Sequence, residues 1–525
     1  MLKVLLSSFI ILIASVINAQ KCGVTPEDNL KITLDLLKNK AELAKGIIYE
    51  RGTAYVPIKF HLVANDDGST KMKESGVFDV LCGLNANYSS VGLQFYISDG
   101  FNYINDTRIN TLPKDGFTAL YIKAKKVSNA INIFLVTDID EAAGQSGEIL
   151  GFADYEGDYL VVLKKECKKE ASTISHELGH YFSLLHTHNG WDGHPYDSLV
   201  DGKMVSLYSP VQAVKKGNYP GQLPTITIKN ECQNGLECDL RGDYICDTPP
   251  DYDMGEAWWK NNCVKWRPIV ISPCGDTVHP MENNYMSYFS GCASYVFTPT
   301  QITQILASYN SARRSYIRTN IKPVTTNGDV TEIATGFIPA NNETTPVYTY
   351  VDLDWSDVPN ATHYYLEIAI GDFIGDFERV ILTESNYKLT KYLGNALIPN
   401  KAYIWRVKAF NNLYTCANFT TKLKFTTGLT NASLDLPENV SYWSVNPNPN
   451  KIGTSLQLQV EATKSFRTSV EIFDGIGKKV DSQIYDIQNG TNNITLNSEL
   501  FTAGLYFVTM NIDNKLYTKK IHFVE

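Results

Sequence analysis

The pattern of apolar and polar positions divides the chain into an α/β part and a β-rich part. Strand-like runs occur at 55–63, 131–136, 149–153 and 159–163, and apolar residues at helical spacing occur near 74–90 and 171–183. We therefore predict a mixed α/β (α+β) domain over residues 52–320. A polar stretch at 321–339 is the expected linker to the part that follows.

Short strands separated by turn signals fill the next part of the chain. Those at 351–355, 362–370 and 401–410 have the spacing of a β-sandwich. Trp355 and the strand Tyr403–Val407 resemble the early tryptophan and the tyrosine-corner strand of fibronectin type III domains. The resemblance covers residues 340–428 and implies a fibronectin type III-like sandwich there.

The first 51 residues have the character of processed segments. Lys3, an apolar run at 4–17 and the small residue Ala19 are typical of a cleaved signal peptide over residues 1–19. A membrane anchor is the alternative, but the run is short and no later segment is long and apolar enough to span a bilayer. Residues 20–51 are polar, with a helical pattern at 30–37 that lacks a complete core, so we expect a pro-segment there.

Composition and charge narrow the range of partners. The 525 residues are 43% hydrophobic and 20% charged, as in folded globular proteins. A formal net charge of -9 offers no basic surface for a polyanion, so nucleic acid is not an expected partner. In an exported chain, ten cysteines indicate disulfides.

Three histidines and a glutamate are clustered at residues 176–186. His176 and His180 are four residues apart, so on a helix their imidazoles lie one turn above each other and can bind one metal ion. His186 supplies the third ligand that a catalytic zinc needs while one position stays open. Glu177 lies beside the first ligand, where it can act on a water molecule as general base and acid without binding the metal.

The arrangement His-Glu-x-x-His-x-x-x-x-x-His resembles the metzincin metalloproteases, which usually have glycine where this chain has Ser183. Glycine permits a tight turn before the third ligand, and we expect Ser183 to reach such a turn at some cost. Met286 and Tyr288 match the methionine beneath the zinc and the tyrosine that several metzincins place near the metal or the reacting carbonyl. The alternatives are ordinary core packing for Met286 and a structural role for Tyr288. His188 and His194 lack the family spacing, and we expect them at the surface or at the substrate rim.

Several segments around the Met286 region narrow the resemblance further. Cys238–Pro250, Asn284–Met286 and Phe297–Gln301 resemble the pappalysin family and its cytophagalysin-like bacterial members, over about residues 22–315. The resemblance implies crossing disulfides, Cys246 to Cys274 and Cys263 to Cys292. If Cys232 then joins Cys238 and Cys82 joins Cys167, only Cys22 and Cys416 stay free.

Two further expectations concern metal and substrate. Asp239, Asp243 and Asp247 could bind structural calcium, since hard oxygen ligands suit that ion, although a solvated acidic loop explains them equally well. Pappalysins often favour basic residues beside the cut and carry acidic residues between the Met-turn tyrosine and the next cysteine. Here that interval is Phe289–Gly291, which gives no support for an arginine preference, and the substrate stays unnamed.

The segment Gln20–Thr25 resembles the Cys-Gly segment by which some pappalysin relatives are kept inactive. A thiolate is a strong zinc ligand, and in the fourth position it excludes the water that catalysis requires. We therefore expect Cys22 to cap the zinc in the proprotein, and a cut after Arg51 to activate it. The alternative is that Cys22 is a spare or disulfide-bonded cysteine in a disordered tail.

The C-terminal residues form a separate β-rich unit. Asn446–Pro449, the hairpin pattern at 469–480 and the strand at 504–508 resemble the C-terminal sorting domain of type IX secretion cargo. The resemblance implies a β-sandwich over residues 440–525 that the type IX secretion machinery recognises, and a protein that is secreted or attached to the cell surface after export. One more adhesive sandwich is the alternative.

Together these features predict a secreted zinc endopeptidase that acts on proteins or peptides. An extended substrate would pair with the edge strand at 149–153, and Tyr288 with the zinc would stabilise the oxyanion. One alternative is a surface adhesin or glycan-binding protein with a vestigial protease domain. Another is a zinc peptidase of the gluzincin type, with a downstream glutamate as a ligand. The presence of every catalytic residue type argues against the first, and the spacing of His186 argues against the second.

Overall fold

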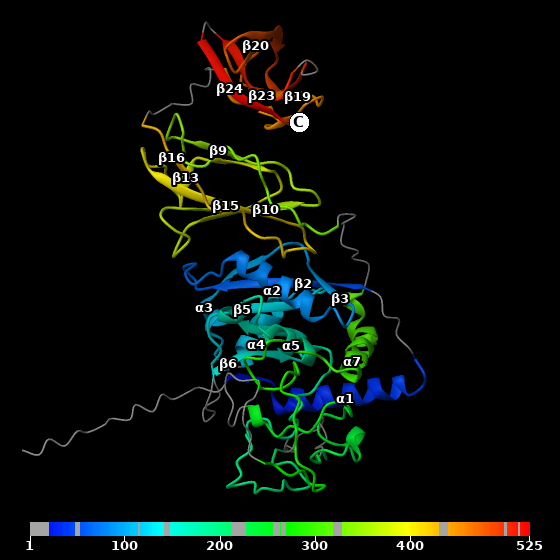
Figure 1. Cartoon of the computed structure of the whole chain (residues 1–525). Helices are drawn as coiled ribbons and strands as arrows, with labels where there is room; N and C mark the ends of the chain where they lie inside the picture. Colours follow the sequence, from blue (N-terminus) through cyan, green and yellow to red (C-terminus); the bar gives the residue numbers. More distant parts are fainter. Residues whose placement is uncertain are drawn as a thin grey trace, which may run out of the picture. The chain divides into compact units, whose positions relative to one another are not determined.

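The computed structural model divides the chain into two compact units, Met1–Thr325 and Thr326–Glu525 (Figure 1). It describes residues 20–47, 53–113, 116–140, 148–211, 227–255, 263, 269–318, 328–429, 439–497, 501–512 and 515–524. The expected signal peptide and the expected cut after Arg51 lie outside the described residues.

The first unit is built on a mixed sheet with the strand order β1-β6-β7-β5-β2-β3, and β4 pairs with β2 beside β3. Its strands are β1 (Gln20–Cys22), β2 (Ala54–Ala64), β3 (Leu93–Ile97), β4 (Asn102–Asn105), β5 (Ile131–Val136), β6 (Glu148–Asp154) and β7 (Tyr159–Leu163). All neighbouring strands are parallel except β6 and β7, which are antiparallel. The α/β character expected from the sequence is therefore confirmed.

The central strands are buried more completely than their alternating pattern predicts. In β2 every residue from Val56 to Ala64 is buried, because β5 lies on one side of it and β3 and β4 on the other. Lys59 is among them, and its ammonium group donates to the carbonyl oxygens of Ser98 and Asp99. Parallel strands of this kind are usually covered on both faces, so the alternation in the sequence did not mark a solvent-exposed face.

Helices accompany this sheet. They are α1 (Pro26–Leu43), α2 (Glu74–Asn87), α3 (Thr107–Thr111), α4 (Gly116–Lys125), α5 (Thr173–Tyr181) and α7 (Pro299–Asn310), with short 3-10 turns at Lys164–Glu166, Cys238–Leu240 and Ala312–Ile317. Figure 1 shows α1 in dark blue running along this layer of sheet and helices, with irregular loops of the green part of the chain on its other side. The pro-segment helix predicted near 30–37 is thus part of the packed unit.

The disulfides differ from the expected set. Cys263 pairs with Cys292 as expected, but Cys232 pairs with Cys274 and Cys238 pairs with Cys246. Cys167 carries a free thiol, while Cys82 and Cys416 are both disulfide-bonded, so the expected Cys82 to Cys167 bridge and the expected free Cys416 are wrong. The Cys238 to Cys246 bridge closes a short loop of neighbouring residues, which the resemblance to a family with crossing bridges did not predict.

The second unit begins with a small β-sandwich. Its strands are β8 (Glu343–Thr344), β9 (Val351–Asp354), β10 (His363–Ala369), β11 (Glu378–Leu382), β12 (Asn386–Leu389), β13 (Lys391–Tyr392), β14 (Asn395–Ala396), β15 (Ala402–Phe410) and β16 (Leu423–Thr426). The main sheet has the order β11-β10-β15-β16-β8, and β12 pairs with β9. Trp355 and Trp405 are buried side by side in its core, and the ring of Tyr403 stacks on Phe425.

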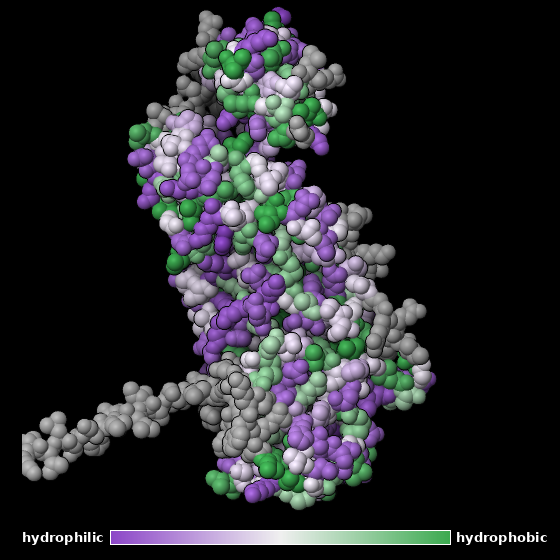
Figure 2. All heavy atoms as spheres, viewed as in Figure 1, coloured by the Kyte–Doolittle hydropathy of each residue, from purple (hydrophilic) through white to green (hydrophobic). Residues whose placement is uncertain are grey.

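The last part is another β-sandwich. Its strands are β17 (Val440–Asn446), β18 (Asn450–Lys451), β19 (Leu456–Ala462), β20 (Phe466–Asp474), β21 (Lys479–Ile487), β22 (Gly490–Leu496), β23 (Gly504–Ile512) and β24 (Lys515–Val524). They form the sheets β17-β19-β22 and β18-β24-β23-β20-β21, whose facing side chains make one core. Hydrophilic residues are spread over the visible face of each unit (Figure 2). Within the described residues, no helix has the length and apolar character needed to cross a membrane.

Candidate metal centre

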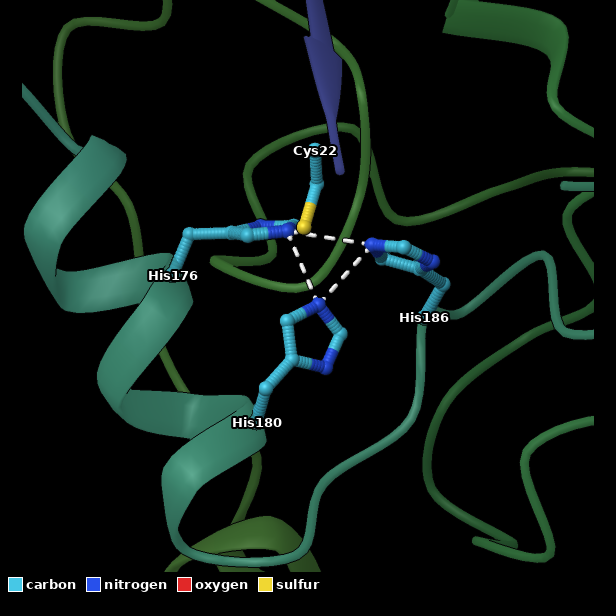
Figure 3. A group of neighbouring side chains, drawn as sticks. All are labelled: Cys22, His176, His180 and His186. Atoms are coloured by element: carbon cyan, nitrogen blue, oxygen red, sulfur yellow. Dashed lines mark hydrogen bonds between the residues drawn. The ribbon is translucent and has the colours of Figure 1, made fainter. Parts of the chain in front are cut away.

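Three histidines converge at the end of helix α5 (Figure 3). His176 and His180 extend from successive turns of α5, and His186 reaches them from the loop that follows. The distances between their Nε2 atoms are 3.1 Å for His176 and His186, 3.2 Å for His176 and His180, and 2.9 Å for His180 and His186. Nitrogens bound to one tetrahedral zinc at about 2.1 Å would be roughly 3.4 Å apart, so this spacing fits a metal site.

The opposite ring nitrogens fix the orientation of each imidazole. Nδ1 of His176 donates to the carbonyl oxygen of Tyr285 at 2.6 Å, and Nδ1 of His180 donates to that of Leu184 at 2.9 Å. Nδ1 of His186 donates to the carboxylate of Asp192. With the proton held on Nδ1, the lone pair of each Nε2 points inward, which is the tautomer that binds a metal.

Burial keeps these rings uncharged. It lowers the pKa of His176 to about 3 and the pKa of His180 well below its ordinary value. For His186 burial again lowers the pKa, and the carboxylate of Asp192 opposes that shift. Neutral imidazoles are the metal-binding form, so the three side chains are ready to bind a cation at neutral pH.

A left-handed turn at Ser183 carries the chain from helix α5 to His186. Ser183 has φ of 67°, a region that favours glycine, so the turn expected from the sequence forms with serine. Its hydroxyl contacts the Tyr155 hydroxyl at 2.8 Å and the Ser308 hydroxyl at 3.0 Å. These hydrogen bonds offset part of the backbone cost of a left-handed residue, which is of order 1 kcal/mol.

Glu177 and Cys22 lie beside the three histidines. The thiol of Cys22, at the end of β1, donates to Oε2 of Glu177 at 3.3 Å. Ligand atoms of Cys22 and the three histidines all lie within 4.8 Å of one another, with the sulfur pointing into the group in Figure 3. Burial raises the pKa of Glu177 to about 8, while the hydrogen bond from Cys22 lowers it. Burial and the Glu177 charge also raise the pKa of Cys22, and a cation at the three Nε2 atoms would reverse that direction by favouring the thiolate.

Met286 and Tyr288 lie on the segment that closes the site from the other side. Met286 is completely buried, and a Cβ added to Gly179 of helix α5 would lie 2.3 Å from its sulfur. The backbone N–H of Cys22 donates to the Tyr288 hydroxyl at 3.1 Å, and the Tyr288 ring lies 4.8 Å from that of His186. Burial raises the pKa of Tyr288, so its hydroxyl keeps the proton needed to donate a hydrogen bond.

The expectation for His188 is wrong, and Asp192 was missed. His188 is fully buried, its ring stacks on that of His186 at 4.6 Å, and the carboxylates of Asp192 and Asp251 lie 3.9 and 3.8 Å from it. His194 is partly exposed and contacts Asp201, as expected of a surface residue. Asp192 has no spacing signature in the sequence, because it contacts the nitrogen of His186 that faces away from the other two histidines.

A cavity of about 420 Å³ opens beside Glu177 and Tyr288. Its wall includes Ser290 and Gly291, which belong to the interval where the family tends to carry acidic residues. Two carboxylates line it from another part of the chain, Glu166 and Glu170, which precede helix α5. The acidic side chains of this cavity wall therefore include Glu166 and Glu170, whereas the residues between Tyr288 and Cys292 contribute none.

The three aspartates considered for calcium have different surroundings. Asp239 is exposed, whereas Asp243 is buried and accepts hydrogen bonds from the Thr248 hydroxyl and the Ile245 N–H. Asp247 accepts hydrogen bonds from Thr298 and Thr300 at the start of helix α7. Calcium binding at these residues stays a prediction.

Comparison with known proteins identifies the C-terminal part. Residues 444–524 match the family model of the secretion system C-terminal sorting domain. An extracellular metalloprotease of Colletotrichum graminicola is 25% identical over 193 residues, which cover 34% of this chain and 68% of that protein. The protein is accordingly a secreted one with a type IX sorting domain, and the sorting domain implies interaction with the secretion machinery.

Solved structures with likeness to this chain include fibronectin-type proteins. The chicken CNTN1 FN1–FN3 domains are 12% identical, with a TM-score of 0.17, and the match covers 38% of this chain and 70% of that one. FN3tt is 19% identical, with a TM-score of 0.14, and covers 19% of this chain and 100% of that one. Scores this low do not bear on the architecture, which stands on the strand pairing described above.

Proposed function

We propose that residues 52–320 are a zinc-dependent endopeptidase of the metzincin type, close to the pappalysins, that is exported as a latent proprotein. The observation that carries the proposal is the convergence of three Nε2 atoms at 2.9 to 3.2 Å, each backed by an Nδ1 hydrogen bond. The weak similarity to an extracellular metalloprotease supports it.

The donor set fits zinc. Three neutral imidazoles leave one of four tetrahedral positions free, which is the composition of a catalytic rather than a structural zinc site. A zinc ion at these atoms would supply Lewis acidity toward a water molecule and a substrate carbonyl. The third donor is an imidazole of His186 at metzincin spacing, which favours this class over the gluzincin alternative.

The chain's own residues supply the proton transfers. Glu177 takes a proton from the attacking water and passes it to the leaving amine, for which a raised pKa is suitable because the carboxyl must hold the proton between the two steps. The Tyr288 hydroxyl donates to the carbonyl oxygen as it gains negative charge. The buried side chain of Met286 supports helix α5 from below.

Latency follows from the position of β1. This strand pairs in parallel with the edge strand β6, with Lys21 opposite Ile149 and Cys22 opposite Gly151, so it occupies the edge that an extended substrate would use. The Cys22 thiol points to the place of the fourth ligand and contacts Glu177. The pro-segment therefore covers the general base, the metal position and the substrate edge together.

The alternative is an adhesin or glycan-binding protein with a vestigial protease domain. In such a protein nothing would preserve the Nδ1 hydrogen bonds that orient the three histidines. All three ligands have those bonds, and Glu177 is positioned beside them. Residues 340–428 in this proposal form a fibronectin type III-like domain, and residues 440–525 serve export.

The first test compares metal content and proteolysis in substituted proteins. Glu177→Ala should retain one zinc per chain and lose nearly all cleavage of casein, whereas His186→Ala should lose both. His194→Ala is the matched control, a histidine outside the cluster, and should keep zinc and activity. An active Glu177→Ala protein, or stoichiometric zinc in His186→Ala, would contradict the assignment.

The second test addresses latency. The proprotein, blocked from cleavage at Arg51, is compared with its Cys22→Ala variant, which should be more active than the parent although β1 still occupies the substrate edge. Cys167→Ala removes the other free thiol of the described residues and should remain latent. Equal activity of parent and Cys22→Ala would rule out a thiol switch.

A further inference from the structure

Helix α1 has more buried side chains than it would need if it served only to hold the Cys22 thiol in place. It starts four residues after Cys22, with the Thr25 hydroxyl accepting a hydrogen bond from the Asp28 N–H as its N-terminal cap. Leu30, Ile32 and Leu36 on this helix are each 0% exposed, like the residues of the central strands. Helix α1 packs against α7, so this burial is against the catalytic unit.

Polar contacts hold the same helix at three separate places. The Asn29 side-chain amide donates to Asn189 at 3.2 Å, three residues beyond the ligand His186. The Tyr155 hydroxyl donates to Asp35 at 2.7 Å. The Lys40 ammonium donates to the carbonyl oxygen of Tyr244 at 2.8 Å.

None of these contacts depends on the chain remaining intact. A cut in the segment 48–52 breaks one peptide bond beyond the C-terminal end of α1 and removes no buried side chain. It changes only the entropy of the system, because the helix loses its tether and its docking becomes a bimolecular equilibrium. Burial of three large apolar side chains, together with the polar contacts, opposes the entropy gained on release of the fragment.

We propose that the surface receiving α1 is a binding site for this helix in its own right, and that residues 20–47 stay bound after the chain is cut between 48 and 52. Latency then ends when the cut fragment dissociates, not at the cut itself. The free fragment binds back in trans, with α1 supplying the affinity and β1 with its Cys22 thiol supplying the inhibition. Only the effect on activity rests on the proposed function, since the docking of α1 does not involve catalysis.

The test follows the fragment itself. A site for a sequence-specific protease replaces residues 48–51 in the full-length Glu177→Ala protein, so that the chain cannot digest its own fragment. After the cut, size-exclusion chromatography with mass spectrometry of the peak measures how much fragment co-elutes, and dilution followed over time gives the dissociation rate. We expect near-complete co-elution of the parent fragment.

Two leucines on α1 provide a matched pair of variants. Leu36 is 0% exposed and Leu34 is 39% exposed, so both Leu→Ala changes alter helix propensity equally but only one removes a buried side chain. Leu36→Ala should speed dissociation by about 30-fold or more, and Leu34→Ala by about threefold at most. If Leu36→Ala prevents folding before the cut, Ile32→Val removes one buried methylene and should speed dissociation by about 2- to 10-fold.

A third variant separates the helix from the thiol. The Cys22→Ala fragment should still co-elute, because α1 holds it. Loss of the parent fragment within minutes of the cut, equal rates for Leu34→Ala and Leu36→Ala, or release of the Cys22→Ala fragment would each overturn the proposal. Because this assay measures no proteolysis, its outcome is independent of whether the zinc peptidase assignment holds.

Discussion

A close approach between Gly179 and Met286 provides a sharp test of how the site is supported. Gly179 lies in helix α5 between Glu177 and the ligand His180, and an added Cβ would be 2.3 Å from the Met286 sulfur and 3.2 Å from its terminal methyl carbon. Separations below 3.0 Å are not tolerated, so Gly179→Ala must displace either the methionine or the helix that carries the ligands.

Two opposing contributions set the size of the effect. Alanine is better than glycine in a helix by about 1 kcal/mol, whereas overpacking a tight core costs about 1–3 kcal/mol. We expect Gly179→Ala to lower the free energy of unfolding by up to about 2 kcal/mol. Met286→Ala alone should cost about 2–5 kcal/mol, since it leaves a cavity beneath the helix.

The double variant separates this contact from other effects. With the methionine side chain removed, the methyl group added at position 179 has room, so the two changes together should cost about 1–3 kcal/mol less than their sum. Urea unfolding of the four proteins, each with zinc and with a chelator, measures the coupling, and zinc content reports the position of the ligands. Gly76→Ala is the control, because the only close approach of its Cβ would be to the flexible end of Met72, which is not fully buried. A coupling below about 0.5 kcal/mol would refute the idea that Met286 supports helix α5 through this contact.

Three further outcomes are expected. Burial lowers the pKa of His61 to about 4, whereas in the unfolded chain this pKa is near 6.5. Between these two values only the unfolded chain takes up the proton, so about 3 kcal/mol of stability should be lost as the pH falls from 6.5 to 4. Urea midpoints measured at the two pH values should show this loss in the parent and not in His61→Gln. The double change Glu166→Gln and Glu170→Gln should reduce any preference for a basic residue beside the cut by about fivefold. The preference is measured as kcat/KM for a peptide with a basic residue there divided by kcat/KM for a neutral one. An unchanged ratio would show that the cavity does not select charge. A chain truncated at 438 should accumulate in the periplasm with its catalytic unit unimpaired, and normal secretion of that chain would refute the sorting role.

The sequence predicted the elements that have one dominant periodicity. The strands β5 and β7, the helix α5 and the hairpin of β20 and β21 lie where their patterns place them. Helix α1 was expected to lack a complete core, and the reason is that its core is shared with α7, which is more than 250 residues away in the chain. A contact at that separation leaves no periodic trace in either segment.

The disulfide pairing and the burial of His188 could not be predicted from the sequence for a similar reason. Six cysteines between residues 232 and 292 allow 15 connectivities, and the choice depends on the path of irregular loops without periodicity. His188 was expected at the surface or at the substrate rim because it lacks the family spacing. Its ring is buried because Asp192 and Asp251 surround it with negative charge, and burial of a polar ring is tolerated when charges of opposite sign lie near.

In the candidate metal centre, the sequence predicted the contacts made by side chains at fixed spacing and missed those made by the backbone. The positions of His176, His180 and His186 follow from the helix repeat and one turn. The orientation of the first two rings, however, is set by the carbonyl oxygens of Tyr285 and Leu184, and any residue at those positions would supply the same acceptor. Of the three acceptors, only Asp192 performs this task with a side chain. Replacing Asp192 should therefore free the His186 ring without removing a ligand of the proposed metal, whereas no single substitution removes the carbonyl acceptors behind His176 and His180.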